Sequence, residues 1–64
     1  MSPMEEAFYR RRIDFQVDSA ASWVELFAEA ADLSDLRAAE IAGDGFRMAI
    51  AAIGDTLARA EGGA

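Results

Sequence analysis

The stretch that decides the fold reads DLRAAEIAGDGFRMAIAAIGDTLARAE and covers residues 35–61. Its apolar residues recur at alternating spacings of three and four, which places them on one stripe of a single α-helix. The stripe consists of Leu36, Ala39, Gly43, Phe46, Ile50, Ile53, Leu57 and Ala60. Because this register is unbroken, the pattern predicts one helix over residues 35–61. The glycines at 43 and 45 mark the place where it could instead break.

The centre of this stretch, residues 48–54, has no polar side chain on any face of the predicted helix. A single neighbouring helix covers only one side of such a segment, and exposed apolar patches of this kind mark interfaces. The sequence therefore predicts that this region is buried in an oligomer or a complex.

The composition limits both the means of stabilisation and the chemistry. The chain has 64 residues and no cysteine or histidine, so it lacks disulfides, zinc–thiolate sites and the commonest general base. A core of this size barely offsets the conformational entropy lost on folding, which leaves association with a partner subunit as the means of stabilisation. We therefore expect a non-enzymatic protein with no catalytic residue, metal site or cofactor.

The charge is acidic overall and uneven along the chain. Twelve acids oppose six arginines for a net charge of −6. Residues 1–12 sum to +1 (three arginines, two acids) and residues 13–64 to −7 (three arginines, ten acids). No apolar run approaches the roughly 20 residues of a membrane span, and the N-terminus carries Glu5 and Glu6 without an apolar run, unlike a signal peptide. The sequence predicts a cytoplasmic protein, and its alanine-rich, lysine-free composition is typical of a bacterial source.

The first 17 residues predict a short helix followed by an extended arm. Residues 2–5 (SPME) have the order of a capping box with proline at the first helical position, which indicates a helix over residues 3–11. Residues 13–17 (IDFQV) then alternate apolar and polar side chains, which favours an extended segment over residues 12–17. The predicted docking arm for a partner consists of Arg10, Arg11, Arg12, Ile13, Phe15 and Val17.

Residues 19–32 predict a helix antiparallel to residues 35–61. Asp18 and Ser19 are suited to cap it, with Ser22 and Glu25 as a second capping box one turn later. Its polar positions form a narrow stripe that we interpret as solvated: Ser22, Glu25, Glu29 and Asp32. The connection at residues 33–34 is short enough to make the two helices neighbours, with Ser34 as the cap of the second.

These elements predict a single all-α domain that contains an N-terminal arm (1–17), a helical hairpin (18–61) and a tail (62–64). Two hairpins would dimerise into a four-helix bundle through Trp23, Phe27, Phe46, Ile50, Ile53 and Leu57. Such a protein would act as an adaptor, inhibitor or regulatory subunit that binds a protein partner.

An alternative comes from the order of the elements, because strand, helix, short turn and helix over residues 12–50 resemble the ribbon-helix-helix family of DNA-binding regulators. The resemblance implies a dimer whose paired strands enter the major groove, and an antitoxin or regulator that uses residues 10–16. Arg12, Asp14 and Gln16 would then point towards the bases. Asp14 and Asp18 oppose the arginines on that surface, so the interaction module is the first hypothesis.

Overall fold

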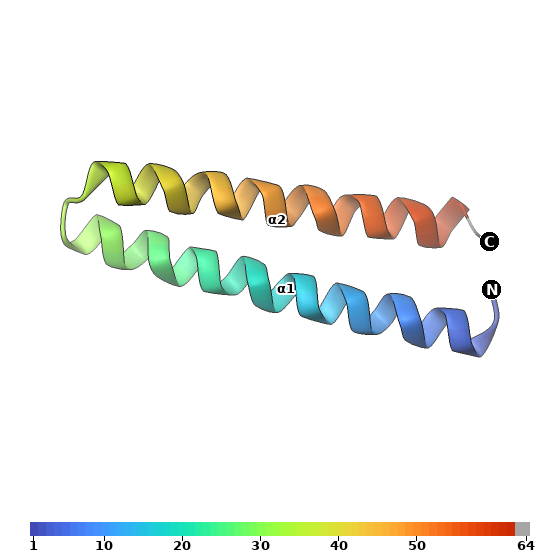
Figure 1. Ribbon diagram of the computed structural model, residues 1–64. Helices are drawn as coiled ribbons and strands as arrows, with labels where there is room; N and C mark the ends of the chain where they lie inside the picture. The colour runs from blue at the N-terminus through green and yellow to red at the C-terminus, as the bar shows by residue number, and fades with distance from the viewer. Residues whose placement is uncertain (63–64) are drawn as a thin grey trace.

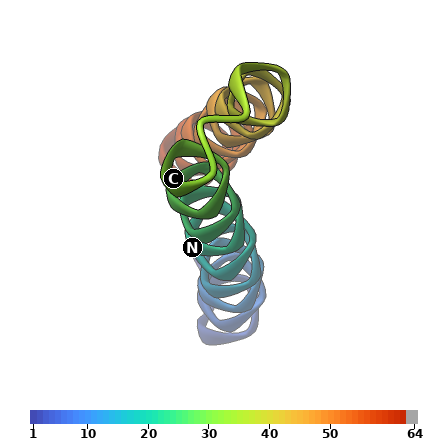
Figure 2. The same ribbon diagram turned by 90° about the vertical axis from the view of Figure 1, so that its left-hand side faces the viewer.

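The computed structural model describes residues 1–62, and these form two α-helices joined by a short turn (Figure 1). Helix α1 spans Pro3–Asp32 and helix α2 spans Leu36–Gly62. The helices run antiparallel, so that the start of α1 and the end of α2 lie at the same end of the molecule. Viewed along its length, the hairpin shows the two helices inclined to one another (Figure 2). The predicted all-α hairpin is confirmed.

The hairpin is an elongated slab. Its Cα extents are 48 × 16 × 9 Å and its radius of gyration is 14.8 Å. A compact chain of this length would have a radius of gyration of about 11 Å. The slab is one helix thick, so each helix has a neighbour on one side alone within the described residues.

Helix α1 is continuous over 30 residues, and the predicted extended arm at residues 12–17 is therefore wrong. The alternation fits a period of two, but Ile13 and Val17 are four residues apart and also share a helical face. Tyr9, Ile13 and Gln16 continue a spacing of four and three that places them towards α2, where each is partly or fully buried. The predicted helices at 3–11 and 19–32 are two parts of α1.

The continuity of α1 also removes the element on which the ribbon-helix-helix interpretation depended. No β-strand occurs in residues 1–62, and residues 12–17 lie within the helix. Asp18 and Ser19 do not begin a helix, and Ser22 does not form a capping box with Glu25. The Ser22 hydroxyl instead donates a hydrogen bond of 3.1 Å to the Asp18 carbonyl, as serine often does inside helices.

The start of α1 matches its predicted capping box. The Glu5 backbone N–H donates to the Ser2 hydroxyl at 3.2 Å, and the Ser2 backbone N–H donates to the Glu5 carboxylate at 3.5 Å. Pro3 occupies the first turn, where its missing N–H costs nothing. These contacts satisfy N–H groups that the first helical turn leaves without partners.

The turn between the helices is closed by a left-handed residue. Ser34 has a φ of 54°, and its N–H donates to the Ala31 carbonyl at 3.0 Å while the Asp35 N–H donates to Ala30 at 2.9 Å. This hydrogen-bond pair is the Schellman motif, in which glycine is the usual left-handed residue. Asp35 then caps α2 by accepting the Ala38 N–H at 3.1 Å. The prediction that Ser34 is the cap is wrong because Ser34 reverses the chain.

Helix α2 passes through Gly43 and Gly45 without a break, which confirms the predicted single helix. The seam between the helices is made mostly of small side chains. The buried apolar residues of the described chain are Ala20, Ala30 and Ala42, and the buried polar residues are Gln16 and Thr56. Small residues let helices approach closely, so the hairpin closes without a large apolar core.

Trp23 packs directly on Gly45 in the seam. A Cβ added at Gly45 would overlap the indole ring of Trp23, with the Cε3 atom only 2.6 Å away. By contrast, a Cβ at Gly43 would meet the Phe27 ring at an ordinary 3.9 Å. Gly45 is therefore required by the position of Trp23, in addition to any effect on helix propensity.

The structure also tests predictions about the polar stripe of α1 and the C-terminal tail. The polar stripe at residues 22, 25, 29 and 32 is exposed, as predicted. The ion pairs within residues 1–62 are Arg10–Glu6 (3.2 Å) and Arg47–Asp44 (3.5 Å). Gly62 is the last residue of α2, and the rest of the predicted tail lies outside the described residues. Within these same residues, no helix has the length and apolarity needed to cross a membrane.

Candidate protein interaction surface

The apolar stripe of α2 does not coincide with the seam. The seam is centred on Ala42, Ala49 and Thr56, which are buried or partly buried. The residues that begin each heptad of the stripe lie beyond the seam on one side of it: Leu36, Gly43, Ile50 and Leu57. A helix has only one side facing its neighbour, so this part of the stripe is free to contact something other than α1.

The residues beyond the seam join apolar side chains of α1 to form one surface, which we call the Ile50 face. It consists of Val17, Val24 and Phe27 from α1 and Gly43, Phe46, Ile50 and Leu57 from α2. An open groove of about 420 Å³ lies over its Gly43 end and is lined by Val24, Phe27, Gly43, Phe46 and Arg47. Val17, Ile50 and Leu57 extend the face because they lie one or two heptads from groove residues.

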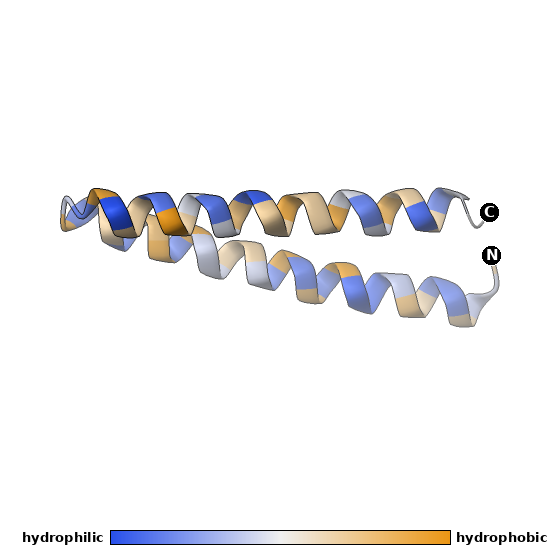
Figure 3. Cartoon of the chain, turned by 45° about the horizontal axis from the view of Figure 1, so that its top comes forward, coloured by the Kyte–Doolittle hydropathy of each residue, from blue (hydrophilic) through white to orange (hydrophobic). Residues whose placement is uncertain are grey.

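Five side chains of the Ile50 face are half exposed, whereas Phe46 is partly buried. Val17, Val24, Phe27, Ile50 and Leu57 have exposed fractions between 46 and 50 %. Each side chain therefore covers the edge of the seam with one half and presents the other half outward. Figure 3 shows apolar residues (orange) on the outward turns of both helices, and not only between them.

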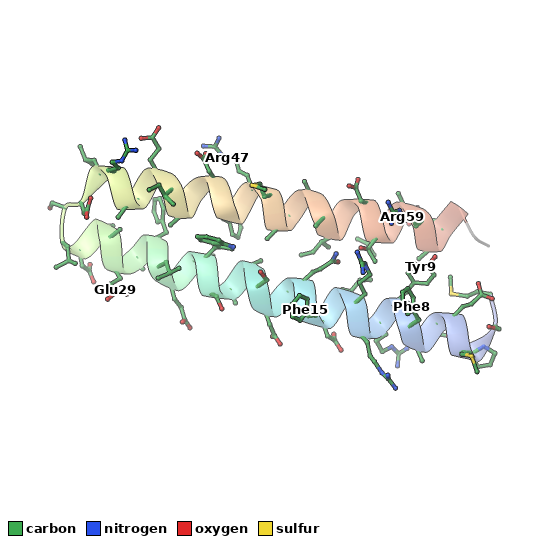
Figure 4. All side chains as sticks on the ribbon, in the orientation of Figure 1. Phe8, Tyr9, Phe15, Glu29, Arg47 and Arg59 are labelled. Carbon is green, nitrogen blue, oxygen red and sulfur yellow. The ribbon has the colours of Figure 1, made fainter. Side chains whose placement is uncertain are left out.

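The opposite side of the seam has a different composition, and we call it the Met48 face. It consists of Phe15, Ser19 and Leu26 from α1 and Ile41, Met48 and Ala52 from α2. Its hollows are lined by serine and charged residues as well as apolar ones, such as Arg12 and Gln16 beside Ala52. Phe15 projects outward from α1 in Figure 4 and is 74 % exposed.

The structure brings together five of the six residues predicted for the interface. Phe27 and Phe46 line the groove at Gly43, while Ile50 and Leu57 continue the same face along α2. Ile53 is partly buried at the edge between this face and the seam. Trp23 differs from the others because its ring lies on Gly45 within the seam.

The residues predicted for the docking arm do not form one surface. Consecutive helical residues point about 100° apart, so Arg10, Arg11 and Arg12 diverge around α1. Arg10 is paired with Glu6, and Ile13 is directed towards α2. Phe15 lies on the Met48 face and Val17 on the Ile50 face. These six residues therefore lie on different sides of α1 and do not form the predicted arm.

Sequence reasoning missed the part of the seam that α1 supplies. Tyr9, Ile13, Gln16, Ala20, Trp23, Phe27 and Ala30 follow spacings of four and three over the length of α1. Tyr9 points towards α2 in Figure 4. This heptad register was readable from the sequence, but alanine and glutamine give it little hydrophobic contrast.

The charged side chains lie mainly on the outside of the slab. Glu29 points away from α2 and Arg47 points away from α1 in Figure 4. No group of three or more acidic side chains suited to hold a metal ion occurs in the part of the chain that the structure describes. The arrangement is suited to binding by apolar contact, with a charged periphery that keeps the slab hydrated.

Comparison with protein-family models gives no match, and neither does comparison with curated proteins or with solved structures.

Proposed function

We propose that this chain is a non-enzymatic interaction module that binds another protein chain through the Ile50 face. One observation carries the proposal: the seam buries alanines, whereas the valine, phenylalanine, isoleucine and leucine side chains of the Ile50 face stay half exposed. Removing apolar surface from water is worth about 25 cal/mol per Å². Covering this face therefore offers a stabilisation that the seam alone does not supply.

The shape of the Ile50 face favours a protein over a small molecule. Small-molecule sites are concave and enclose most of their ligand, whereas this face is open and runs along both helices of a slab 48 Å long. An amphipathic helix or helix pair would lie along it with apolar residues at heptad spacing. Adaptors, inhibitors and regulatory subunits act through surfaces of this kind.

The charge of the chain restricts the partner. With a net charge of −6 and an exposed acidic stripe on α1, the exterior repels strongly acidic molecules at low salt. The groove of the Ile50 face has one charged lining residue, Arg47, which is paired with Asp44, so recognition there is mainly by apolar complementarity.

Site-specific photo-cross-linking tests the proposal in the cells from which the sequence comes. A photoreactive benzoylphenylalanine is placed at Val24, on the Ile50 face, or at Glu25, the next residue, on the exposed polar stripe. We expect a protein adduct from position 24 and little or none from position 25. Equal yields from both positions, or no adduct from position 24, would contradict the proposal.

A further inference from the structure

We propose that the chain bound to the Ile50 face is a second copy of this protein, with the two α2 helices packed antiparallel and Ile50 on the twofold axis. This inference rests on the proposed function and names its partner. In this register, Gly43 of each copy lies opposite Leu57 of the other, because both residues are seven positions from Ile50.

We infer this register from the different side-chain sizes of Gly43, Ile50 and Leu57. Gly43 leaves the groove of about 420 Å³ beside Phe27 and Phe46, while Leu57 projects half exposed from the same face. The two residues are separated by 14 positions, or about 21 Å along the helix. An antiparallel pair brings the large side chain of each copy to the groove of the other, which is the self-complementarity that a twofold dimer requires.

A parallel pair in the same register fits less well. It would place Gly43 against Gly43 and leave the groove empty, and it would place Leu57 against Leu57. Side-chain size therefore favours the antiparallel orientation.

The area of the face is sufficient for a stable dimer. The two longer Cα extents, 48 and 16 Å, give the whole broad side of the slab that contains the Ile50 face an area of about 770 Å² on each copy. Two copies would bury about 1,500 Å² in total, within the range of about 1,200–2,000 Å² found for stable interfaces. The resulting assembly is a four-helix bundle, which gives each helix a second neighbour.

Disulfide cross-linking of single-cysteine variants tests the register, since the natural chain has no cysteine. Ile50→Cys should oxidise rapidly to a covalent dimer, because residues on the axis of close helices meet the distance limits of a disulfide. Met48→Cys, on the other face of the same helix, is the matched control and should form little or no covalent dimer under the same conditions. Equal rates of oxidation for the two variants would overturn the proposal.

Mixed cross-linking separates the two orientations. A mixture of Gly43→Cys and Leu57→Cys chains should give the mixed dimer in excess over both self-linked dimers. Preferential linkage of Gly43→Cys to itself would indicate a parallel pair and contradict the register.

A size exchange provides a test without oxidation. Gly43→Leu should crowd the groove and Leu57→Ala should leave it unfilled, each raising the dimer Kd by about tenfold or more, since 1.4 kcal/mol is a factor of ten. The double variant restores one small and one large residue at each contact and should recover most of the affinity. Additive loss in the double variant, measured by analytical ultracentrifugation, would overturn the register.

The two proposals fail in different ways. A folded natural chain that sediments as a monomer at high concentration would overturn the second-copy inference. An adduct between position 24 and a different protein would then leave the interaction module in place. The absence of any adduct from position 24 would instead count against the interaction module itself.

Discussion

The two sides of the hairpin seam differ in the size of the residues beside it. The Ile50 side is flanked by valines, isoleucine and leucine, with Gly43 as the one gap along α2. The Met48 side is flanked by the small residues Ser19, Ala38, Gly45 and Ala52, and it also carries exposed apolar side chains: Phe15, Leu26, Ile41 and Met48. The helices therefore approach each other over small residues, and the larger aliphatic side chains lie where α1 does not cover them. The surface that holds the hairpin closed and the surface available to a partner are different.

The largest expected effect comes from placing a charge on the Ile50 face. Ile50→Asp would bury an unpaired carboxylate at the centre of the proposed interface, which costs about 3–5 kcal/mol. We expect loss of the dimer in analytical ultracentrifugation and a lower unfolding midpoint. Met48→Asp is the matched control, because Met48 is 74 % exposed on the opposite side and should tolerate the charge. Equal effects of the two substitutions would mean that the two sides are equivalent.

A substitution in the seam tests the contact between Trp23 and Gly45. Gly45→Ala gains about 1 kcal/mol in helix propensity but overpacks the indole, at a cost of about 1–3 kcal/mol. We expect a net destabilisation in urea unfolding followed by circular dichroism. Gly54→Ala provides the control, because no atom lies within 4 Å of its added Cβ and the variant should gain about 1 kcal/mol. A Gly45→Ala variant as stable as Gly54→Ala would show that the indole does not occupy this position.

A third prediction concerns the buried amide of the seam. Gln16 is 9 % exposed, and its Oε1 atom has no hydrogen-bond partner among residues 1–62. An unsatisfied buried acceptor costs about 1–3 kcal/mol. Gln16→Met keeps the length of the side chain and removes that acceptor, so we expect it to raise the free energy of unfolding by about 1 kcal/mol. Destabilisation by Gln16→Met would indicate that the amide has a partner in the assembly.

The smallest expected effect is at the turn, away from both faces. Ser34→Gly relieves the left-handed strain at a φ of 54° and should stabilise the hairpin by about 0.5–1 kcal/mol. Ser34→Ala retains that strain and should give no gain. Thermal unfolding of the two variants measures the difference, and an equal melting temperature would argue against the left-handed conformation.

The heptad register of residues 35–61 was enough to predict α2, its continuity through two glycines and the antiparallel hairpin. The capping box at Ser2 likewise gave the correct start of α1. Residues 12–17 were mispredicted because five alternating residues fit a strand, and also a helix in which Ile13 and Val17 share a face. Gln16 is buried against α2, which fits the helix and not the strand. The five residues of sequence around it give no indication that this polar side chain is buried.

The candidate surface was only partly predictable for a related reason. The large residues Phe27, Phe46, Ile50 and Leu57 were identified because hydrophobicity marks them. The side of α2 that faces α1 was not, since alanine and threonine in the seam have little hydrophobic contrast with their surroundings. At the turn, Ser34 and Asp35 are both good caps, and only the backbone angle of Ser34 distinguishes them.

The contact between Trp23 and Gly45 also has a consequence for the order of folding. It joins residues 22 positions apart, whereas Tyr9 and Ala60, which line one hollow at the open end, are 51 positions apart. Closing a short loop costs less entropy, so contacts near the turn are expected to form first. The chain has a single tryptophan. Its fluorescence should therefore report the earliest step, before circular dichroism records completion of the helices.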